Sequence, residues 1–250
     1  MTTSYSSFDN GQPRDAACWA ESISTLQLSH VPTGALNLNV EGRHVIGPLQ
    51  GFGQLWQKTY RVHLPGDLAS PTEVIAVWKA HFPTFLPPEQ RFYPAVDGVE
   101  PGKIILINAT LSGMPISTGV VVLYADDESF TLMTPQGHPE SGWVTFSAYT
   151  EDNTTICQVQ SLARANDPLY ELAFRLFGAT AQESIWNKVL QALAAYYQTH
   201  TQVQLDKICV DPSIQWSQVR NIWQNAAAWT LLYKLSMPLR WLKSSALHIR

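Results

Sequence analysis

Residues 114–142 constrain the fold more than any other part of the sequence. They read as two strands joined by the acidic turn Asp126-Asp127-Glu128, followed by a tight Gly-His-Pro loop that begins at Gly137. A short Asp-rich turn between two apolar runs is typical of an antiparallel hairpin. A second turn of this kind, at residues 151–153, separates two further apolar runs. The sequence therefore predicts a sheet of consecutive antiparallel strands.

Six segments have the composition and spacing of strands. They are residues 56–64, 103–111, 118–125, 129–134, 142–150 and 154–164. In the first of them, Trp56, Tyr60, Val62 and Leu64 share one side of a period of two. We expect this strand to be half-buried, and Pro65 to end it.

Two main helices are expected. The first begins at Ser70 as N-cap, with Glu73 completing a capping box, and ends at Pro83. The second follows an Asp-Pro pair, runs over residues 169–197 and is kinked at Gly178. Its apolar stripe comprises Leu172, Leu176, Phe177, Ile185, Val189, Leu193 and Tyr196. A short helix at 15–28 is also expected, after a disordered segment at 1–14.

This order of elements predicts an α+β fold. We expect a curved antiparallel sheet of about six to seven strands wrapped around the long C-terminal helix, followed by an extra C-terminal helix. A curved sheet cannot lie flat against a straight helix, so the two would enclose a space. The predicted organisation is an N-terminal extension at 1–40, partly disordered, a domain at 41–200, and a basic, Trp-rich helical extension at 201–250.

The composition limits the classes of function. Charged residues make up only 14% of the chain and aromatic residues 11%, so apolar surface is left over for a large core, a cavity or an interface. The net charge of −4 argues against a nucleic-acid partner. The sequence has no metal-ligand spacing and no phosphate-binding Gly-rich loop, so we expect neither a metal nor a cofactor. Three separated cysteines, no secretory signal and no 18-residue apolar run predict a cytoplasmic protein.

The charge is unevenly distributed along the chain. No Asp or Glu follows Pro212, and residues 1–212, with the other 11 basic and all 20 acidic residues, have a net charge of −9. The basic residues after Pro212 are Arg220, Lys234, Arg240, Lys243 and Arg250. We expect a last helix that starts at 211–213 and is interrupted at Pro238. Its apolar face comprises Val219, Ile222, Trp223, Ala226, Trp229 and Tyr233. Residues 213–245 would then pack on the body or form a homodimer, the favoured interpretation, or contact a membrane surface peripherally.

Four sequence runs carry a resemblance to a known superfamily. They are G-P-L-Q-G-F-G-Q-L-W-Q-K-T-Y-R-V (47–62), M-P-I-S-T-G-V-V-V-L-Y (114–124), T-P-Q-G-H-P-E-S-G-W (134–143) and R-A-N-D-P-L-Y-E (164–171). Residues 40–198 resemble the START-like, helix-grip superfamily (SRPBCC, Bet v 1-like), and more closely an uncharacterised bacterial family with a G-H-P-x-x-G loop. The resemblance implies a hydrophobic cavity between sheet and helix. It implies no particular ligand, because the superfamily holds enzymes, carriers and regulators.

Several residues are candidates for a site. His138 and Glu140 could form an acid–base pair, although a structural turn with Gly137 at positive φ is the favoured interpretation. Arg164 could reach an anionic ligand, but pairing with Glu171 or Asp167 is favoured. Asp167 is expected to cap the long helix. The proposed ligand-binding set is Tyr60, Asn108, Tyr124, Trp143, Tyr149, Arg164 and Tyr170, for each of which core packing is the alternative.

Three functions are compatible with these observations. The first is non-catalytic binding of an apolar small molecule or lipid between the sheet and the long helix, which the aromatic richness and the lack of a catalytic motif favour. The second is a cyclase- or hydrolase-type enzyme in which His138, Glu140 and Tyr124 move protons. The third is a membrane-surface or protein-interaction module that acts through the C-terminal segment.

Overall fold

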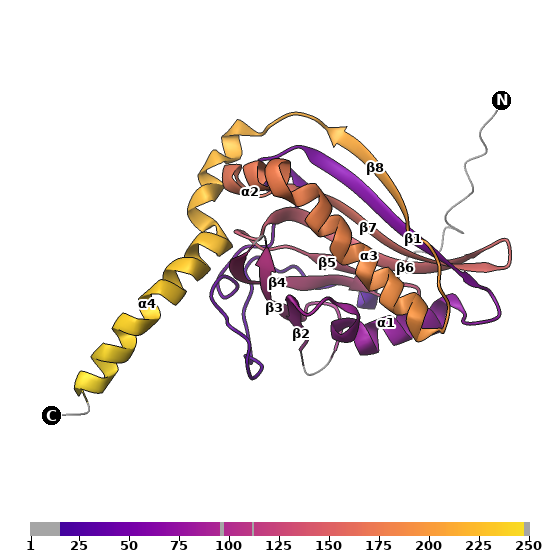
Figure 1. Ribbon diagram of the computed structural model, residues 1–250, viewed down its shortest axis with the longest axis horizontal. Coiled ribbons are helices and arrows are strands. Elements are labelled where there is room, and N and C mark those ends of the chain that lie inside the picture. Colours follow the sequence, from indigo (N-terminus) through magenta and orange to yellow (C-terminus); the bar gives the residue numbers. More distant parts are fainter. Residues whose placement is uncertain (1–15, 96–97, 112, 248–250) are drawn as a thin grey trace.

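The computed structural model describes residues 16–95, 98–111 and 113–247, with the side chains of 177–182 and 238–247 excepted. The segment 1–14, expected to be disordered, and Asp15 lie outside these residues. One curved antiparallel sheet wraps around a long helix, and a second long helix projects away from the body (Figure 1). The predicted α+β, helix-grip arrangement is confirmed.

The sheet has eight strands in the order β2-β3-β4-β5-β6-β7-β1-β8, and every neighbouring pair is antiparallel. The strands are β1 (Leu55–Pro65), β2 (Gln90–Tyr93), β3 (Ile104–Leu111), β4 (Met114–Ala125), β5 (Ser129–Met133), β6 (Glu140–Glu151), β7 (Thr154–Ala165) and β8 (Gln204–Asp211). The six predicted strands are all present. The short strand β2 and the edge strand β8 were not predicted.

The two acidic turns form hairpins as expected. Asp152 and Asn153 both have positive φ, 46° and 60°, which is the backbone of the two-residue turn between β6 and β7. In the other turn, the Asp126 carboxylate accepts hydrogen bonds from the backbone N–H groups of Glu128 at 2.9 Å and Ser129 at 2.7 Å. Residues within a few positions of one another therefore form both turns.

Helix α1 (Pro71–Phe85) packs on the concave face of the sheet. Its capping box is formed as predicted, since the Ser70 hydroxyl accepts from the Glu73 N–H and the Glu73 carboxylate accepts from the Ser70 N–H. The predicted end at Pro83 is wrong, because the helix continues to Phe85. Phe82 and Phe85 are both buried in the core, and this packing holds the last turn in helical form despite the proline.

The long helix is divided into three parts. Helix α2 (Pro168–Ala173) is followed by a π-helical turn, η3 (Phe174–Gly178), and by α3 (Ala179–Tyr196). The predicted irregularity at Gly178 thus falls at the end of the π turn. Such a turn inserts a residue and rotates the helix that follows, so one apolar stripe cannot serve both parts.

The predicted stripe is accordingly only partly correct. Ile185, Val189 and Leu193 pack in the core, whereas Leu172, Leu176 and Tyr196 are exposed. The side chain of Phe177 lies outside the described set. The face that α3 turns toward the sheet also contains Trp186, Leu190 and Ala194, which are buried.

Aromatic side chains fill the centre of the concave face. Phe146 on β6 stacks on Phe130 with ring centroids 4.6 Å apart, and it meets Trp78 at 5.2 Å and Phe82 at 5.1 Å edge to face. Trp186 of α3 closes the cluster at 5.5 Å from Phe146. The middle of the space between sheet and helix is therefore packed core, not a hollow.

The convex face is covered by the segment at 16–46. Leu26 and Val40 of this segment are fully buried against Leu106 and Val121 of the sheet. The helix expected at 15–28 does not form, and the described part contains only the 3-10 turn η1 (Ala16–Cys18). The chain is held in extended form instead, by bridges to the sheet and to itself such as Trp19 with Tyr124.

The C-terminal segment differs most from expectation. Residues 201–250 were predicted to be helical, but they begin with β8, which pairs with β1 at the sheet edge. A 3-10 helix, η4 (Trp216–Gln224), precedes the last helix, α4 (Ala226–Leu247). The predicted helix start at 211–213 is therefore wrong, and α4 runs through Pro238 without interruption. In the described residues, no helix combines the length and the apolarity that crossing a membrane requires.

Candidate functional site

An open cavity of about 300 Å³ lies at one end of the concave face. Its floor is formed by Trp56 and Lys58 of β1 and by Ser161 and Ala163 of β7. The remaining lining residues are Gln54, Glu140, Arg164, Ala165, Glu171, Phe174, Arg175, Glu183 and Lys207. The cavity lies beside the π turn, where the helix passes from α2 to α3. The expected space between sheet and helix is thus reduced to this end.

Charged side chains line much of the cavity, and four of them form two ion pairs. Arg175 Nε lies 2.7 Å from Glu171 Oε1, and Lys207 Nζ lies 2.8 Å from Glu183 Oε1. The two glutamate side chains are only 13% and 16% exposed. Apolar surface comes from Trp56, Phe174 and the two alanines. The wall therefore combines apolar surface with ion pairs, and it is more highly charged than the hydrophobic cavity that the resemblance implied.

Tyr60 lies next to the cavity on the same face of β1 as Lys58. It is fully buried, and its hydroxyl has no hydrogen-bond partner among the described side chains and backbone. Burial raises the pKa of the hydroxyl well above its ordinary value, and the nearby carboxylates of Glu183 and Glu140 raise it further. A neutral O–H donor without a partner is thus held close to two cavity carboxylates.

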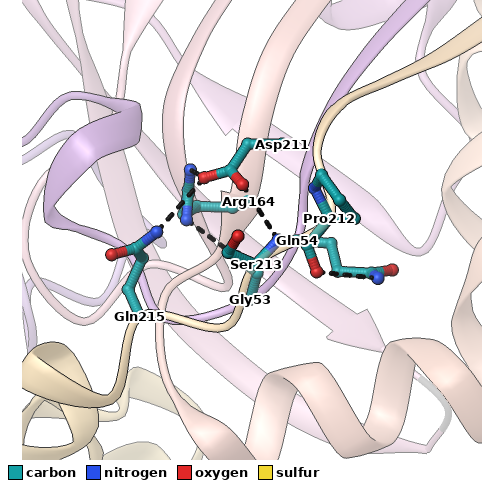
Figure 2. Close-up of polar contacts among 7 residues, drawn as sticks. All are labelled: Gly53, Gln54, Arg164, Asp211, Pro212, Ser213 and Gln215. Carbon is teal, nitrogen blue, oxygen red and sulfur yellow. Dashed lines mark hydrogen bonds and ion pairs between the residues drawn. The ribbon is translucent and has the colours of Figure 1, made fainter.

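Arg164 forms the ion pair shown in Figure 2. One guanidinium nitrogen donates to the Gly53 carbonyl at 3.1 Å, and the other lies 2.9 Å from Asp211 Oδ2 at the end of β8. The expected pairing with Glu171 or Asp167 is wrong, because β8, which was not predicted, brings Asp211 closer. Asp211 also accepts from the Ser213 N–H at 2.9 Å, and this hydrogen bond together with Arg164 lowers the pKa of the carboxyl to about 2. Arg164 borders the cavity, but its two terminal nitrogens bind the Gly53 carbonyl before β1 and the Asp211 carboxylate of β8.

The Gly-His-Pro loop has a structural role. Gly137 has φ +85°, and its carbonyl accepts from the Ala226 N–H at 2.9 Å. The His138 Nδ1 accepts from the backbone N–H of Glu140 at 3.0 Å, so the two side chains form no acid–base pair. Withdrawal of the ring from water lowers the pKa of His138 to about 4. The favoured interpretation of this loop as a turn is therefore correct, and of the proposed pair only Glu140 lines the cavity.

Four of the proposed ligand-binding residues lie on the convex face, away from the cavity. A β-bulge after Val122 turns Tyr124 outward, where its ring meets Trp19 with centroids 4.7 Å apart and its hydroxyl donates to Asp126. Asn108 hydrogen-bonds the backbone of Leu36. Trp143 and Tyr149 alternate with the inward-facing residues of β6 and so point to the same outer side.

Residues at the start of the long helix connect to the C-terminal segment. Asp167 caps α2 as predicted, since its carboxylate accepts from the N–H groups of Leu169 at 2.8 Å and Tyr170 at 3.1 Å. Burial raises the pKa of this carboxyl, although these hydrogen bonds oppose the shift. The Tyr170 hydroxyl accepts from the Ala227 N–H at 3.0 Å. Tyr170 therefore packs under α4 instead of facing the cavity, whereas Glu171, Phe174 and Arg175 line it.

Most of the charged cavity residues were not predicted, although the sequence contains a signal for two of them. Lys58 lies two residues after Trp56 and two before Tyr60, so the alternation of the strand predicts its side chain on the inward face of β1. Glu183 lies three residues before the buried Trp186, so the helical spacing predicts both side chains on the same face of α3. Among the described residues, no group of three His, Cys, Asp or Glu side chains is arranged to hold a metal ion.

The sheet, the long helix and the cavity between them define a helix-grip protein. No protein-family model matches the sequence, and none of the curated proteins matches it. Solved structures with a similar arrangement include the di-domain ARO/CYC protein StfQ from the steffimycin biosynthetic pathway, at 10% identity and a TM-score of 0.46 over 58% of this chain. The match covers 51% of StfQ, so the chain spans about half the length of that protein.

Two further structures are similar to this chain. A START superfamily protein from Mycobacterium smegmatis matches at 19% identity and a TM-score of 0.43, over 58% of this chain and 98% of that one. Norcoclaurine synthase from Thalictrum flavum matches at 14% identity and a TM-score of 0.43, over 57% of this chain and 94% of that one. All three TM-scores are below 0.5. The fold assignment therefore rests on the arrangement of sheet and helix described above.

Proposed function

We propose that this protein binds a small molecule with an apolar body and polar groups at its edge, in the cavity between β1, β7 and the α2–α3 helix, without catalysing a reaction. The observation that carries the proposal is the open cavity of about 300 Å³ on the concave face. This volume is at the lower end of the range for ligand pockets. It suits a molecule of one or two rings or a short chain, and it is too small for a lipid with two acyl chains.

The lining supports this class of ligand. Trp56 and Phe174 offer ring surfaces for an apolar body. The two ion pairs at the rim offer polar contacts. The enzymatic alternative has less support, because His138 and Tyr124 do not reach the cavity.

We further propose a reducing, cytoplasmic setting. Cys18, Cys157 and Cys209 are all free thiols, and none is paired with another.

The experiment that tests the proposal fills the cavity with a larger side chain and measures binding of a fluorescent probe. The probe is anilinonaphthalene sulfonate, which has an apolar body and an anionic edge. Ala163→Phe places a ring in the cavity, whereas Leu162→Phe adds the same ring on the opposite face of the same strand. We expect probe affinity to fall by about tenfold or more, or about 1.4 kcal/mol, for Ala163→Phe and to change little for Leu162→Phe. Unchanged probe binding by a folded Ala163→Phe protein would contradict the proposal. Native mass spectrometry of the freshly purified protein then gives the mass of any co-purifying ligand.

A further inference from the structure

The C-terminal segment carries a large exposed apolar surface, here called the tail surface. It is made of Trp216, Val219 and Trp223 on η4 and Trp229, Leu231, Leu232, Leu235 and Met237 on α4. Trp216 is 71% exposed, Trp223 is 78% exposed and Leu235 is 66% exposed. Apolar side chains grouped in this way on a soluble body mark a surface that is covered by something else.

The tail surface is held in place by the body. The first turn of α4 is buried against β4, where Thr230 accepts from the Ser117 N–H at 3.0 Å. Asn39 binds the same turn through the Ala226 carbonyl at 3.3 Å. One turn later Lys234 still borders a pocket with Arg91 and Ile116 of the sheet, and the rest of α4 projects from the body (Figure 1). The exposed side chains are therefore presented outward on an anchored helix.

A second apolar group lies beside the tail surface. Leu169 and Leu172 of α2 and Leu176 of the π turn are about half exposed or more, and α2 packs against η4. These leucines precede and flank Phe174 and Arg175, which line the cavity. The exposed apolar surface thus begins next to the cavity mouth and continues onto η4.

The positive charge of the C-terminal segment is complementary to an anionic lipid surface. No acidic residue follows Asp211, and Arg220 and Lys234, which stand among the exposed apolar residues, are themselves exposed. Exposed Trp side chains are enriched at the boundary between lipid headgroups and acyl chains, and nearby Lys and Arg are attracted to anionic headgroups. The same residues fit a second copy of this chain less well, since a symmetric pairing of two tails would oppose cations with cations.

We propose that the tail surface docks on an anionic lipid membrane, with Trp223, Leu232 and Leu235 inserted at the headgroup boundary and Arg220 and Lys234 bound to headgroups. The helix lies on the membrane and does not cross it. Docking in this way places the cavity mouth near the lipid surface, from which an apolar ligand could be taken up or released. The docking itself does not depend on what the cavity binds.

The test is flotation of the full-length protein with vesicles of phosphatidylcholine, with and without phosphatidylserine. We expect binding to the vesicles that contain phosphatidylserine and weaker binding at high salt, because surface charges are screened. Arg220→Gln combined with Lys234→Gln is expected to lower binding about 25-fold, since each cation contributes roughly a factor of five, or about 1 kcal/mol. Trp223→Ser combined with Leu232→Ser and Leu235→Ser is expected to abolish it.

The matched control removes an exposed apolar side chain from another part of the body. Leu68→Ser should leave flotation unchanged, because Leu68 is exposed just beyond the Pro65 end of β1, and η4 follows β8 at the opposite end of that strand, where Leu55 pairs with Asp211. Circular dichroism checks that every variant is folded, and light scattering gives the oligomeric state. The proposal is overturned if the folded wild-type protein does not float with either vesicle, or if the triple variant floats as well as the wild type. It is also overturned if the wild type is a dimer that the triple variant converts to a monomer without any vesicle binding.

Discussion

Replacing Phe146 by Ala tests whether the centre of the concave face is packed core or ligand space. Phe146 is fully buried and contacts four other rings, those of Trp78, Phe82, Phe130 and Trp186. Removing a buried Phe side chain from a packed core costs about 3–5 kcal/mol, because apolar contacts are lost and a cavity is left. The neighbours belong to α1, α3 and β5, so no single element can move in to fill the space.

The expected result is a loss of about 4 kcal/mol in the free energy of unfolding, measured by urea denaturation. For a chain of this size it corresponds to a fall in Tm of about 8–16 °C. The control is Trp223→Ala, which removes a larger but exposed ring and should change stability by less than about 0.5 kcal/mol. A loss below about 1.5 kcal/mol for Phe146→Ala would refute the reasoning, because it would mean that the space around this ring is not closely packed.

Two predictions concern the Gly-His-Pro loop. In Gly137→Ala, at φ +85°, the new Cβ would lie 2.1 Å from the Gln224 carbonyl oxygen. The substitution should therefore lower the free energy of unfolding by more than the roughly 1–2 kcal/mol that an Ala in the left-handed region costs. Gly42→Ala, at φ +73° with open space around it, should show that backbone cost alone in the same urea denaturation assay. The pKa of His138 is about 4 in the folded protein and about 6.5 in the unfolded chain. Between these pH values the unfolded state binds more protons than the folded state. The free energy of unfolding therefore falls as the pH drops through this window, by on the order of 3 kcal/mol. Denaturation curves at pH values across the window should lose this dependence in His138→Gln and keep it in His30→Gln, an exposed site; equal pH dependence in both variants would contradict the assignment.

The sequence was sufficient wherever local chemistry determines structure. The Asp126 and Asp152 turns, the Ser70 capping box and the Asp167 cap all form as predicted, because each depends on residues within a few positions of one another. Strand alternation in β1 was also correct, since Tyr60, Val62 and Leu64 face the core. These features were enough to predict a curved sheet around a long helix.

Predictions of which strand face is inward failed where the period of two was broken. The bulge after Val122 turns Tyr124 to the convex face, and nothing in the run of apolar residues around it indicates where the extra residue lies. In the same way, the π turn before Gly178 rotates α3 relative to α2, so that Leu172 and Leu176 become exposed. Both errors arise from one inserted residue, whose position is set by packing and not by local propensity.

The sequence by itself determined the α+β class, the order of the eight main elements from β1 to α2 other than β2, and the capping and turn residues that define their ends. What only the tertiary structure decided is the character of the site. Strand β8 adds to the sheet edge and brings Asp211 to Arg164, aromatic rings fill the centre of the grip, and the cavity that remains is lined by Glu171, Glu183 and Lys207. Caps and turns are fixed by interactions between near neighbours in the chain. The site depends on contacts between residues up to about 150 positions apart, from β1 to β8, which no local pattern encodes.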